Sequence, residues 1–286
     1  CLIFLGFLKM SKLGLSYIGW DTKTHMQAFN AWNNQSDLNF NFNYGSFAEQ
    51  KYLLESVKLL NKPRIVDIGC ATGTTYRFLN NKLGSSNYSY KGIDLSKSAI
   101  DRARSLYPGV DFLISNGERP HKTIGLKADI VFSRDTILHQ ENPYDFLDQL
   151  MEITERFLII RLRTRDHGET EFDISKSCQM HYNKFWMPYI VLNTDELISY
   201  FKNNDNVVKV TINRSYEVLG GANFRFLPKD LYEERARGAE TSIIVELGSM
   251  KKEGEIEIVY DNSIQGRQFL KQNRWNFKYL IYRLIS

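Results

Sequence analysis

Short apolar strands alternate with helices along the middle of this chain, and that alternation constrains the fold more than any other feature. The expected strands cover residues 64–68, 88–93, 110–114, 129–133, 157–161, 207–212 and 242–247. Strands separated by helices form parallel βαβ units, whose sheet is covered on both faces. The sequence therefore predicts a doubly wound α/β fold, with a mostly parallel seven-stranded sheet and helices on both faces.

The helix boundaries follow from capping residues and prolines. Ser46-Phe-Ala-Glu49 resembles a capping box at the start of the first helix, and Pro63 ends that helix. Pro143 suits the first turn of a later helix, and Asn193 opens the last one. The expected helices cover about 46–62, 73–82, 96–106, 144–155 and 197–201.

The composition excludes several classes of protein. A chain of 286 residues with 43% hydrophobic and 24% charged residues is neither disordered, collagen-like nor a coiled coil. Its three cysteines form no CxxC pair, which favours a reducing, cytoplasmic setting without disulfides. Cys178 and His181, with His167, lack a fourth metal ligand, so no metal is expected. The net charge of +4 arises from 37 basic and 33 acidic residues and does not favour a nucleic-acid partner.

A glycine-rich loop follows the first expected strand. Asp67, Gly69, Ala71 and Gly73 fit the pattern D-x-G-x-[GA]-x-G, with Cys70 inside the loop. Small residues let a ligand approach the backbone, and the N-terminus of the next helix favours a polar or anionic group by about 0.3–1 kcal/mol per contact. A tight strand–helix turn without a ligand is the alternative interpretation.

Asp94 ends the second expected strand at the spacing typical of a ribose-binding acid. A carboxylate there can accept two hydrogen bonds from ribose hydroxyls. The alternative is a carboxylate that stabilises the N-terminus of the helix beginning near Ser96. Together with the glycine loop, Asp94 indicates a ribose-bearing ligand.

These segments resemble the class I S-adenosylmethionine-dependent methyltransferases, a family with a Rossmann-like fold. The resemblance covers about residues 46–247 and depends on Val66–Gly73, Gly92–Ser96, Phe112–Arg119 and Ala128–Pro143. It implies S-adenosylmethionine as the cofactor, with Asp67 and the glycine loop around its methionine part. It also implies that Asp94 holds the ribose and that Leu95 lies against the adenine. Asn116-Gly117 replaces the family's usual Asp and small residue, and the Asn carbonyl can still accept from the adenine amino group.

The acceptor side is expected after the fourth strand. Ser133 is expected to contact the cofactor through its backbone, and His139 is the best candidate for a general base because of its ordinary pKa. A packing role for His139 is the alternative. Arg134 is the other catalytic candidate, since Arg134 and Asp135 either bind a charged acceptor or pair with each other. Asn142-Pro143-Tyr144 lies too far beyond the strand for a DNA amino-methyltransferase signature, which argues against DNA modification.

The remaining segments are assigned by composition. Residues 1–45 are an aromatic arm or lid, and the domain of 46–247 carries insertions at about 162–193 and 214–240. In the first insertion, Arg161, Arg163 and Arg165 are candidates for binding a carboxylate or phosphate, with a solvated loop as the alternative. The basic aromatic tail of 248–286 either contacts a membrane surface or protein partner or docks on its own domain. The apolar residues 1–8 are too short to cross a bilayer, and Met10 is an alternative start.

The expected function is methyl transfer from S-adenosylmethionine to an oxygen or nitrogen of a small molecule, a sugar or another metabolite. One alternative is a non-catalytic protein that binds S-adenosylmethionine or another nucleotide. The other is a transferase of a different group from the same type of cofactor, such as aminopropyl. Aminopropyl transfer to a polyamine requires an acidic pocket, which Arg134 and His139 do not supply.

Overall fold

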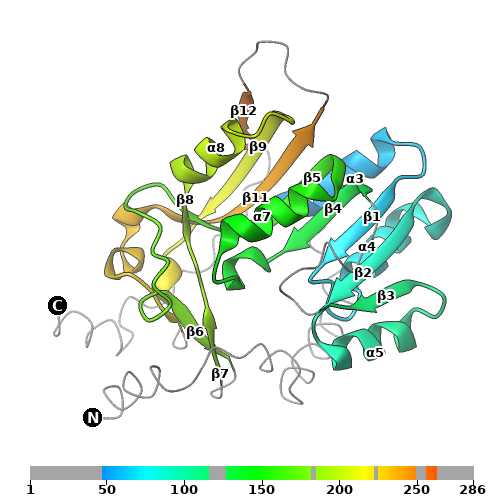
Figure 1. Cartoon of the computed structure of the whole chain (residues 1–286), viewed down its shortest axis with the longest axis horizontal. Coiled ribbons are helices and arrows are strands. Elements are labelled where there is room, and N and C mark those ends of the chain that lie inside the picture. Colours follow the sequence, from blue (N-terminus) through cyan, green and yellow to red (C-terminus); the bar gives the residue numbers. More distant parts are fainter. Residues whose placement is uncertain (1–46, 116–126, 182–184, 222–224, 249–255, 263–286) are drawn as a thin grey trace.

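A central sheet of nine strands organises the computed structural model, which describes residues 47–115, 127–181, 185–221, 225–248 and 256–262 (Figure 1). Across the sheet the strands are β12 (Glu257–Tyr260), β9 (Val207–Tyr216), β11 (Gly238–Leu247), β5 (Thr154–Arg165), β4 (Ala128–Arg134), β1 (Arg64–Ile68), β2 (Ser89–Asp94) and β3 (Asp111–Ile114). The two-residue β8 (Leu192–Asn193) pairs with the end of β5. Strand β11 is antiparallel to both of its neighbours, and the other pairs are parallel.

The seven predicted strands are all present, and the mostly parallel sheet is confirmed. The predicted number of strands is too small because β8 and β12 also join the sheet. Strand β12 lies in the segment that composition assigns to the tail, and it pairs in parallel with β9. Strand β5 runs to Arg165, four residues beyond its predicted end, so Arg161, Arg163 and Arg165 lie in the sheet rather than in a loop.

Helices cover both faces of the sheet, as the doubly wound prediction requires. One face packs against α3 (Ala48–Leu59), α4 (Thr74–Leu83) and α5 (Lys97–Leu106), and the other packs against α7 (Pro143–Glu152) and α8 (Thr194–Lys202). The strands alternate between these cores: Ile130 and Phe132 of β4 face the first, and Val131 faces the second. This period of two is the pattern of a strand buried on both sides.

The starts of the helices agree with the sequence except at α3. Asn142 and Asn193 cap α7 and α8 by accepting hydrogen bonds from backbone N–H groups of the first turn. The predicted capping box at Ser46 is wrong, because Phe47 is the N-cap residue of α3, and the side chain of Phe47 makes no capping hydrogen bond. The carboxylate of Glu49 instead lies in a buried ionic cluster, where it stabilises contacts with the sheet.

A second, three-stranded sheet lies beside the main one. It consists of β6 (Cys178–His181), β7 (Phe185–Pro188) and β10 (Arg225–Phe226). In the view of Figure 1, β6 and β7 lie below the main sheet. A separate apolar core joins this region to the 3-10 turn at Ile137–His139 (η3), through Leu138, Tyr189, Val191, Leu219, Leu227, Leu231 and Ala236. The small sheet is thus anchored close to the end of β4.

Candidate cofactor and acceptor site

The candidate site lies where the order of the strands reverses. Strand β1 has β2 on one side and β4 on the other, so the loops that follow these three strands emerge at one edge of the sheet. Open α/β sheets bind ligands outside the carboxyl ends of their strands at such a reversal. The residues predicted from the glycine loop, the second strand and the fourth strand therefore come together at one edge.

The glycine loop is folded tightly against β2. The N–H groups of Gly69 and Cys70 both donate to the Ile93 carbonyl, at 2.8 and 3.1 Å. Gly69 has φ +82°, and a Cβ atom there would lie 2.2 Å from Thr136 Oγ1, so glycine is required. Gly73, also at φ +82°, is the N-cap residue of α4. The loop therefore presents its backbone, rather than side chains, at the start of α4.

Asp94 joins this loop to the end of β2. Its Oδ2 accepts from the Ala71 N–H at 2.9 Å, and its Oδ1 accepts from the Ser96 N–H at 2.9 Å. Asp94 thus stabilises the start of α5, and it also holds the loop. Each carboxylate oxygen has two lone pairs, so these contacts leave acceptor capacity for ribose hydroxyls. The two interpretations of Asp94 are compatible with each other.

Asp67 is buried within β1, and its carboxylate contacts Tyr90 of β2. The Tyr90 hydroxyl donates to Asp67 Oδ2 at 2.6 Å. Burial raises the pKa of Asp67 to about 7, although hydrogen bonds from Tyr90 and Thr75 lower it and the Asp94 carboxylate raises it further. The sequence offered no pattern that singled out Tyr90 as the partner. Asp67 therefore ties the end of β1 to Tyr90 of β2.

The other predicted cofactor residues have different environments. The Cys70 thiol is buried, and this burial raises its pKa well above the ordinary value. Leu95 is half-buried. The Ser133 hydroxyl is fully buried and donates to the Ile68 carbonyl at 3.0 Å, so its side chain ties β4 to β1. Asn116 and Gly117 lie outside the described residues.

His139 is held at the end of η3. Its Nδ1 lies 2.9 Å from the carbonyl oxygen of Pro188, and its ring packs edge-on against Tyr189. A carbonyl can only accept, so this contact places a proton on Nδ1 and the lone pair of the neutral imidazole on Nε2. The second sheet therefore fixes the tautomer that a base requires.

Arg134 forms an ion pair with Glu49 of helix α3. Its Nε lies 3.2 Å from Glu49 Oε1, but 3.9 Å from Asp135 Oδ2. The guanidinium carbons of Arg134 and Arg161 lie 4.8 and 4.9 Å from the centre of the Phe47 ring. Arg134 and Asp135 are thus neighbours without forming a close pair, and the main partner of Arg134 is Glu49.

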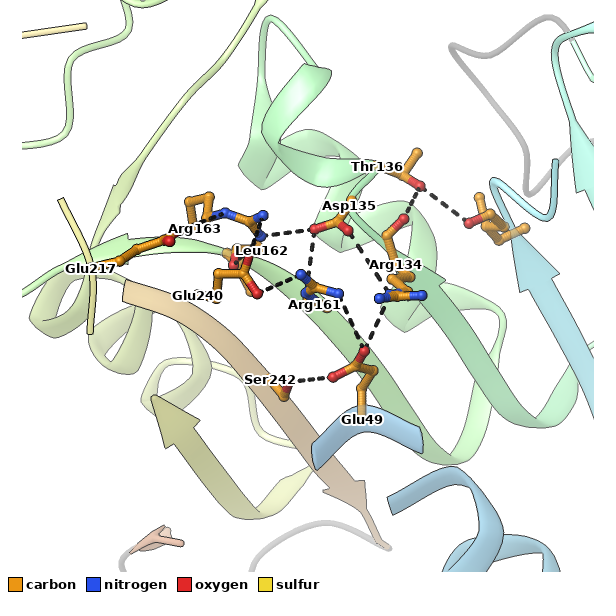
Figure 2. Close-up of polar contacts among 11 residues, drawn as sticks. Glu49, Arg134, Asp135, Thr136, Arg161, Leu162, Arg163, Glu217, Glu240 and Ser242 are labelled. Atoms are coloured by element: carbon orange, nitrogen blue, oxygen red, sulfur yellow. Dashed lines mark hydrogen bonds and ion pairs between the residues drawn. The ribbon is translucent and has the colours of Figure 1, made fainter. Parts of the chain in front are cut away.

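A cluster of charges continues from Arg134 across β5 and β11 (Figure 2). Glu240 accepts from Arg161 Nη2 at 2.5 Å and from Arg163 Nη2 at 2.6 Å. Arg163 Nη1 also donates to Asp135 Oδ1 at 2.9 Å. We call this set the ionic cluster; its members are Glu49, Arg134, Asp135, Arg161, Arg163, Glu217 and Glu240.

Comparison with known protein families identifies the domain that contains this edge of the sheet. Residues 65–156 match the family model described as a methyltransferase domain. These residues include the glycine loop, Asp94, Arg134 and His139. Residues 65–156 of this chain therefore form a methyltransferase domain.

Known proteins that are similar to this chain include a viral relative and two crystal structures. Putative methyltransferase 235L of Invertebrate iridescent virus 6 is 26% identical over 141 residues, which are 48% of this chain and 51% of the viral protein. The chain thus spans about half the length of this curated relative. Two crystal structures of the N-terminal domain of EvdMO1, one with SAH bound and one in the presence of SAH and D-fucose, have TM-scores of 0.51 and 0.52. Each is 13% identical, and the matches cover 70% and 71% of this chain and 80% and 83% of those chains, which shows the shared fold.

Other residues contact this site, although no sequence pattern identified them. Glu240 and Glu217 lie beyond the residues matched by the family model, and they meet the arginines of β5 only in the folded sheet. Thr136 contacts the glycine loop, because its Oγ1 donates to the Ile68 carbonyl at 3.3 Å. In the sequence, each of these residues is a single polar residue within a strand or just after one. Such a residue indicates no contact until the partner strand is known.

Two further findings concern the described part of the domain. No three His, Cys, Asp or Glu side chains among these residues come together in an arrangement that could hold a metal ion. Within the same ranges, no helix is both long and apolar enough to cross a bilayer.

Proposed function

We propose that the chain is a methyltransferase that uses S-adenosylmethionine to methylate an oxygen or nitrogen of a small-molecule acceptor such as a sugar. The observation that carries this proposal is the contact of the Ala71 N–H with Asp94 Oδ2 at 2.9 Å. It joins the glycine loop to the ribose-binding acid at the point where the order of the strands reverses. The two parts of a nucleoside site are thereby held in one arrangement before any ligand binds.

The described residues fit the cofactor. The carboxylate of Asp94 can accept from two ribose hydroxyls, and the start of α4 favours a polar group beside the loop. When bound, S-adenosylmethionine supplies a methyl group on a sulfonium, which an acceptor atom takes by in-line displacement. Positioning of the two reactants by the chain can contribute about 7–11 kcal/mol to such a reaction.

The acceptor must also lose a proton. His139 carries its lone pair on Nε2, because Nδ1 is held by the Pro188 carbonyl. We assign His139 Nε2 as the atom that takes this proton from the acceptor hydroxyl or amine. The crystallised neighbour studied in the presence of D-fucose supports a sugar as one acceptor worth testing, although the likeness to it lies in the fold.

Binding of the cofactor is tested by thermal unfolding with S-adenosylhomocysteine, the demethylated product. A ligand at one hundred times its dissociation constant stabilises the folded state by about 2.7 kcal/mol, so a clear rise in melting temperature is expected. Asp94→Ala should remove most of that rise. Asp101→Ala, on the exposed side of the neighbouring α5, is the matched control and should keep it. Absence of any rise in the wild-type protein would overturn the proposal.

Catalysis is tested separately with methyl-labelled S-adenosylmethionine and fractionated cell extract. Label should move into a small-molecule fraction with the wild-type protein. His139→Gln should keep the thermal response to S-adenosylhomocysteine and lose about 10²-fold or more in the rate of transfer. Binding without transfer to any fraction would support the non-catalytic alternative.

A further inference from the structure

Arg134 is the most exposed arginine of the ionic cluster. Its side chain is 34% exposed, whereas the side chains of Arg161 and Arg163 are 6% and 8% exposed. Arg134 is the last residue of β4, and it lies at the end of the cluster nearest to β1 (Figure 2). His139 ends the 3-10 turn that follows the same strand. Arg134 and the candidate base therefore belong to one connection at the candidate site.

The guanidinium of Arg134 keeps two of its nitrogens free for a ligand. Its ion pairs with Glu49 and Asp135 both involve Nε, which is buried and donates no hydrogen bond. Among the described residues, none accepts a hydrogen bond from Nη1 or Nη2 of Arg134, and neither nitrogen is fully buried. The two Nη groups are therefore available to an incoming molecule.

The acids beside Arg134 are shared with the buried arginines. Asp135 Oδ1 accepts from Arg163 Nη1 at 2.9 Å and lies 3.6 Å from Arg161 Nε. Glu49 Oε1 lies 3.6 Å from Arg161 Nη1, so this oxygen serves two guanidinium groups. Burial and the Arg161 charge lower the pKa of Arg134 below its ordinary value, although the nearby acids raise it. The chain's own acids therefore leave part of the positive charge of Arg134 uncompensated.

The ring of Phe47 holds the guanidinium of Arg134 in place. The guanidinium carbon lies 4.8 Å from the ring centre. An aromatic face attracts a cation, and it does so without using the N–H groups that lie in the plane of the guanidinium. A side chain that is already ordered loses less entropy when a ligand binds. Arg134 is thus prepared to donate two hydrogen bonds to one planar or tetrahedral anion, as guanidinium groups do to carboxylates and phosphates.

We propose that Arg134 binds the methyl acceptor through an anionic group, a carboxylate or a phosphate, which accepts hydrogen bonds from Nη1 and Nη2. This inference rests on the proposed function and specifies its substrate. The same acceptor presents a hydroxyl or amine to His139, so its class is a small acid with such a group, for example a sugar acid or a sugar phosphate. Of the two expectations for Arg134 and Asp135, binding of a charged acceptor is thus favoured over pairing with each other.

Arg134 and His139 have different roles in this arrangement. A guanidinium has no acceptor and stays protonated, so Arg134 orients the acid and leaves proton removal to His139 Nε2. Loss of Arg134 should therefore raise the KM for the acceptor more than it lowers kcat, and it should leave cofactor binding intact. Salt screens an ion pair that is partly exposed, so the KM of the wild-type protein should rise with ionic strength.

The test separates the small molecules of a cell extract on an anion exchanger. The retained, anionic fraction and the flow-through are each incubated with the protein and methyl-labelled S-adenosylmethionine, and the retained fraction should gain at least tenfold more label. Loss of labelling after phosphatase treatment of this fraction assigns a phosphate, and loss after amidation of its carboxyl groups assigns a carboxylate. Equal or greater labelling of the flow-through, or labelling that survives both treatments, would overturn the inference.

Two variants assign the effect to Arg134. Arg134→Gln should lower labelling of the retained fraction at least tenfold, abolish the salt dependence of the apparent KM, and keep the thermal response to S-adenosylhomocysteine. Arg64→Gln, at the start of β1 and so at the opposite edge of the sheet, is the matched control and should change labelling less than twofold. If Arg134→Gln does not fold, Arg134→Lys keeps the charge beside Glu49, loses the paired donors and should raise the apparent KM at least threefold.

The outcomes separate this inference from the proposed function. Labelling and salt dependence that are the same in the Arg134 variant and the wild type would contradict the role of Arg134 alone. A wild-type protein that S-adenosylhomocysteine does not stabilise, or that labels neither fraction, would contradict the proposed function and this inference with it.

Discussion

Glu49 Oε2 accepts a hydrogen bond from the Ser242 hydroxyl at 2.6 Å, although the two residues are 193 positions apart in the chain. The other oxygen of the same carboxylate lies 3.2 Å from Arg134 Nε and 3.6 Å from Arg161 Nη1. Helix α3 is therefore joined to β11, β4 and β5 by one fully buried acid. This connection includes Arg134, which lies on the proposed acceptor side of the methyltransferase domain.

Neutralising Glu49 should destabilise the domain. Glu49→Gln leaves Arg134 and Arg161 without one of their carboxylate partners in a buried setting, where such a loss costs about 3–5 kcal/mol. Glu55→Gln, on the exposed side of the same helix, should change stability by no more than about 0.5 kcal/mol. Urea unfolding of both variants measures the difference. Equal stability of the two would show that Glu49 contributes nothing specific.

Adding a methyl group to Gly69 should be costly for two separate reasons. The left-handed backbone costs an alanine about 1–2 kcal/mol, and overlap with Thr136 Oγ1 adds about 1–3 kcal/mol. Gly109→Ala is the matched control, because Gly109 has φ +85° and no described heavy atom within 4 Å of the added carbon. Its loss should be confined to the backbone component. Denaturant unfolding that shows equal losses would rule out the contact with Thr136.

The stability of the domain should depend on pH through Asp67. Its pKa is about 7 in the folded state, but close to 3.9 in an unfolded chain. Between these values the folded state binds more protons, so stability should fall as pH rises, by up to about 1.4 kcal/mol per pH unit. Asp67→Asn should lack this component. The measurement is the difference in unfolding free energy between wild type and variant from pH 4.5 to 7.5.

Tyr90→Phe provides the control for that prediction. It removes a hydrogen bond that lowers the pKa of Asp67, so the fall in stability should extend to higher pH. If the difference in unfolding free energy between the wild type and Asp67→Asn stays constant with pH, Asp67 is ionised throughout this pH range. The other acids contribute equally to both proteins and cancel in the difference.

Much of the fold was predictable because its signals are local. The strands that flank the glycine loop are short apolar segments between helices, and Pro143 and Asn193 begin helices as predicted. The cofactor loop was predictable for a similar reason, since the position of Asp94 relative to Gly69 is a matter of spacing along the chain. Each of these features depends on residues that are close in sequence.

The acceptor side was less predictable because its contacts are distant in sequence. The alternating Arg161, Arg163 and Arg165 suggested a polar insertion, yet they lie in β5 and pair with acids that follow β4, lie in β11 or lie elsewhere in the fold. Glu49 resembled a capping residue for the same reason. A charged side chain in a strand is indistinguishable from one in a loop until its partner is known.

Strand β11 lies between β5 and β9 in the sheet, although the ribosome makes it after both. Glu240 follows Arg161 by 79 residues and Arg163 by 77. Until β11 pairs with them, β5 and β9 both have an unpaired edge. The guanidinium groups of Arg161 and Arg163 must stay hydrated until then, because burying them without the Glu240 carboxylate would cost several kcal/mol. A nascent chain that has emerged only as far as β9 therefore lacks the carboxylate that bridges Arg161 and Arg163. The ionic cluster can therefore be completed only after β11 has been made.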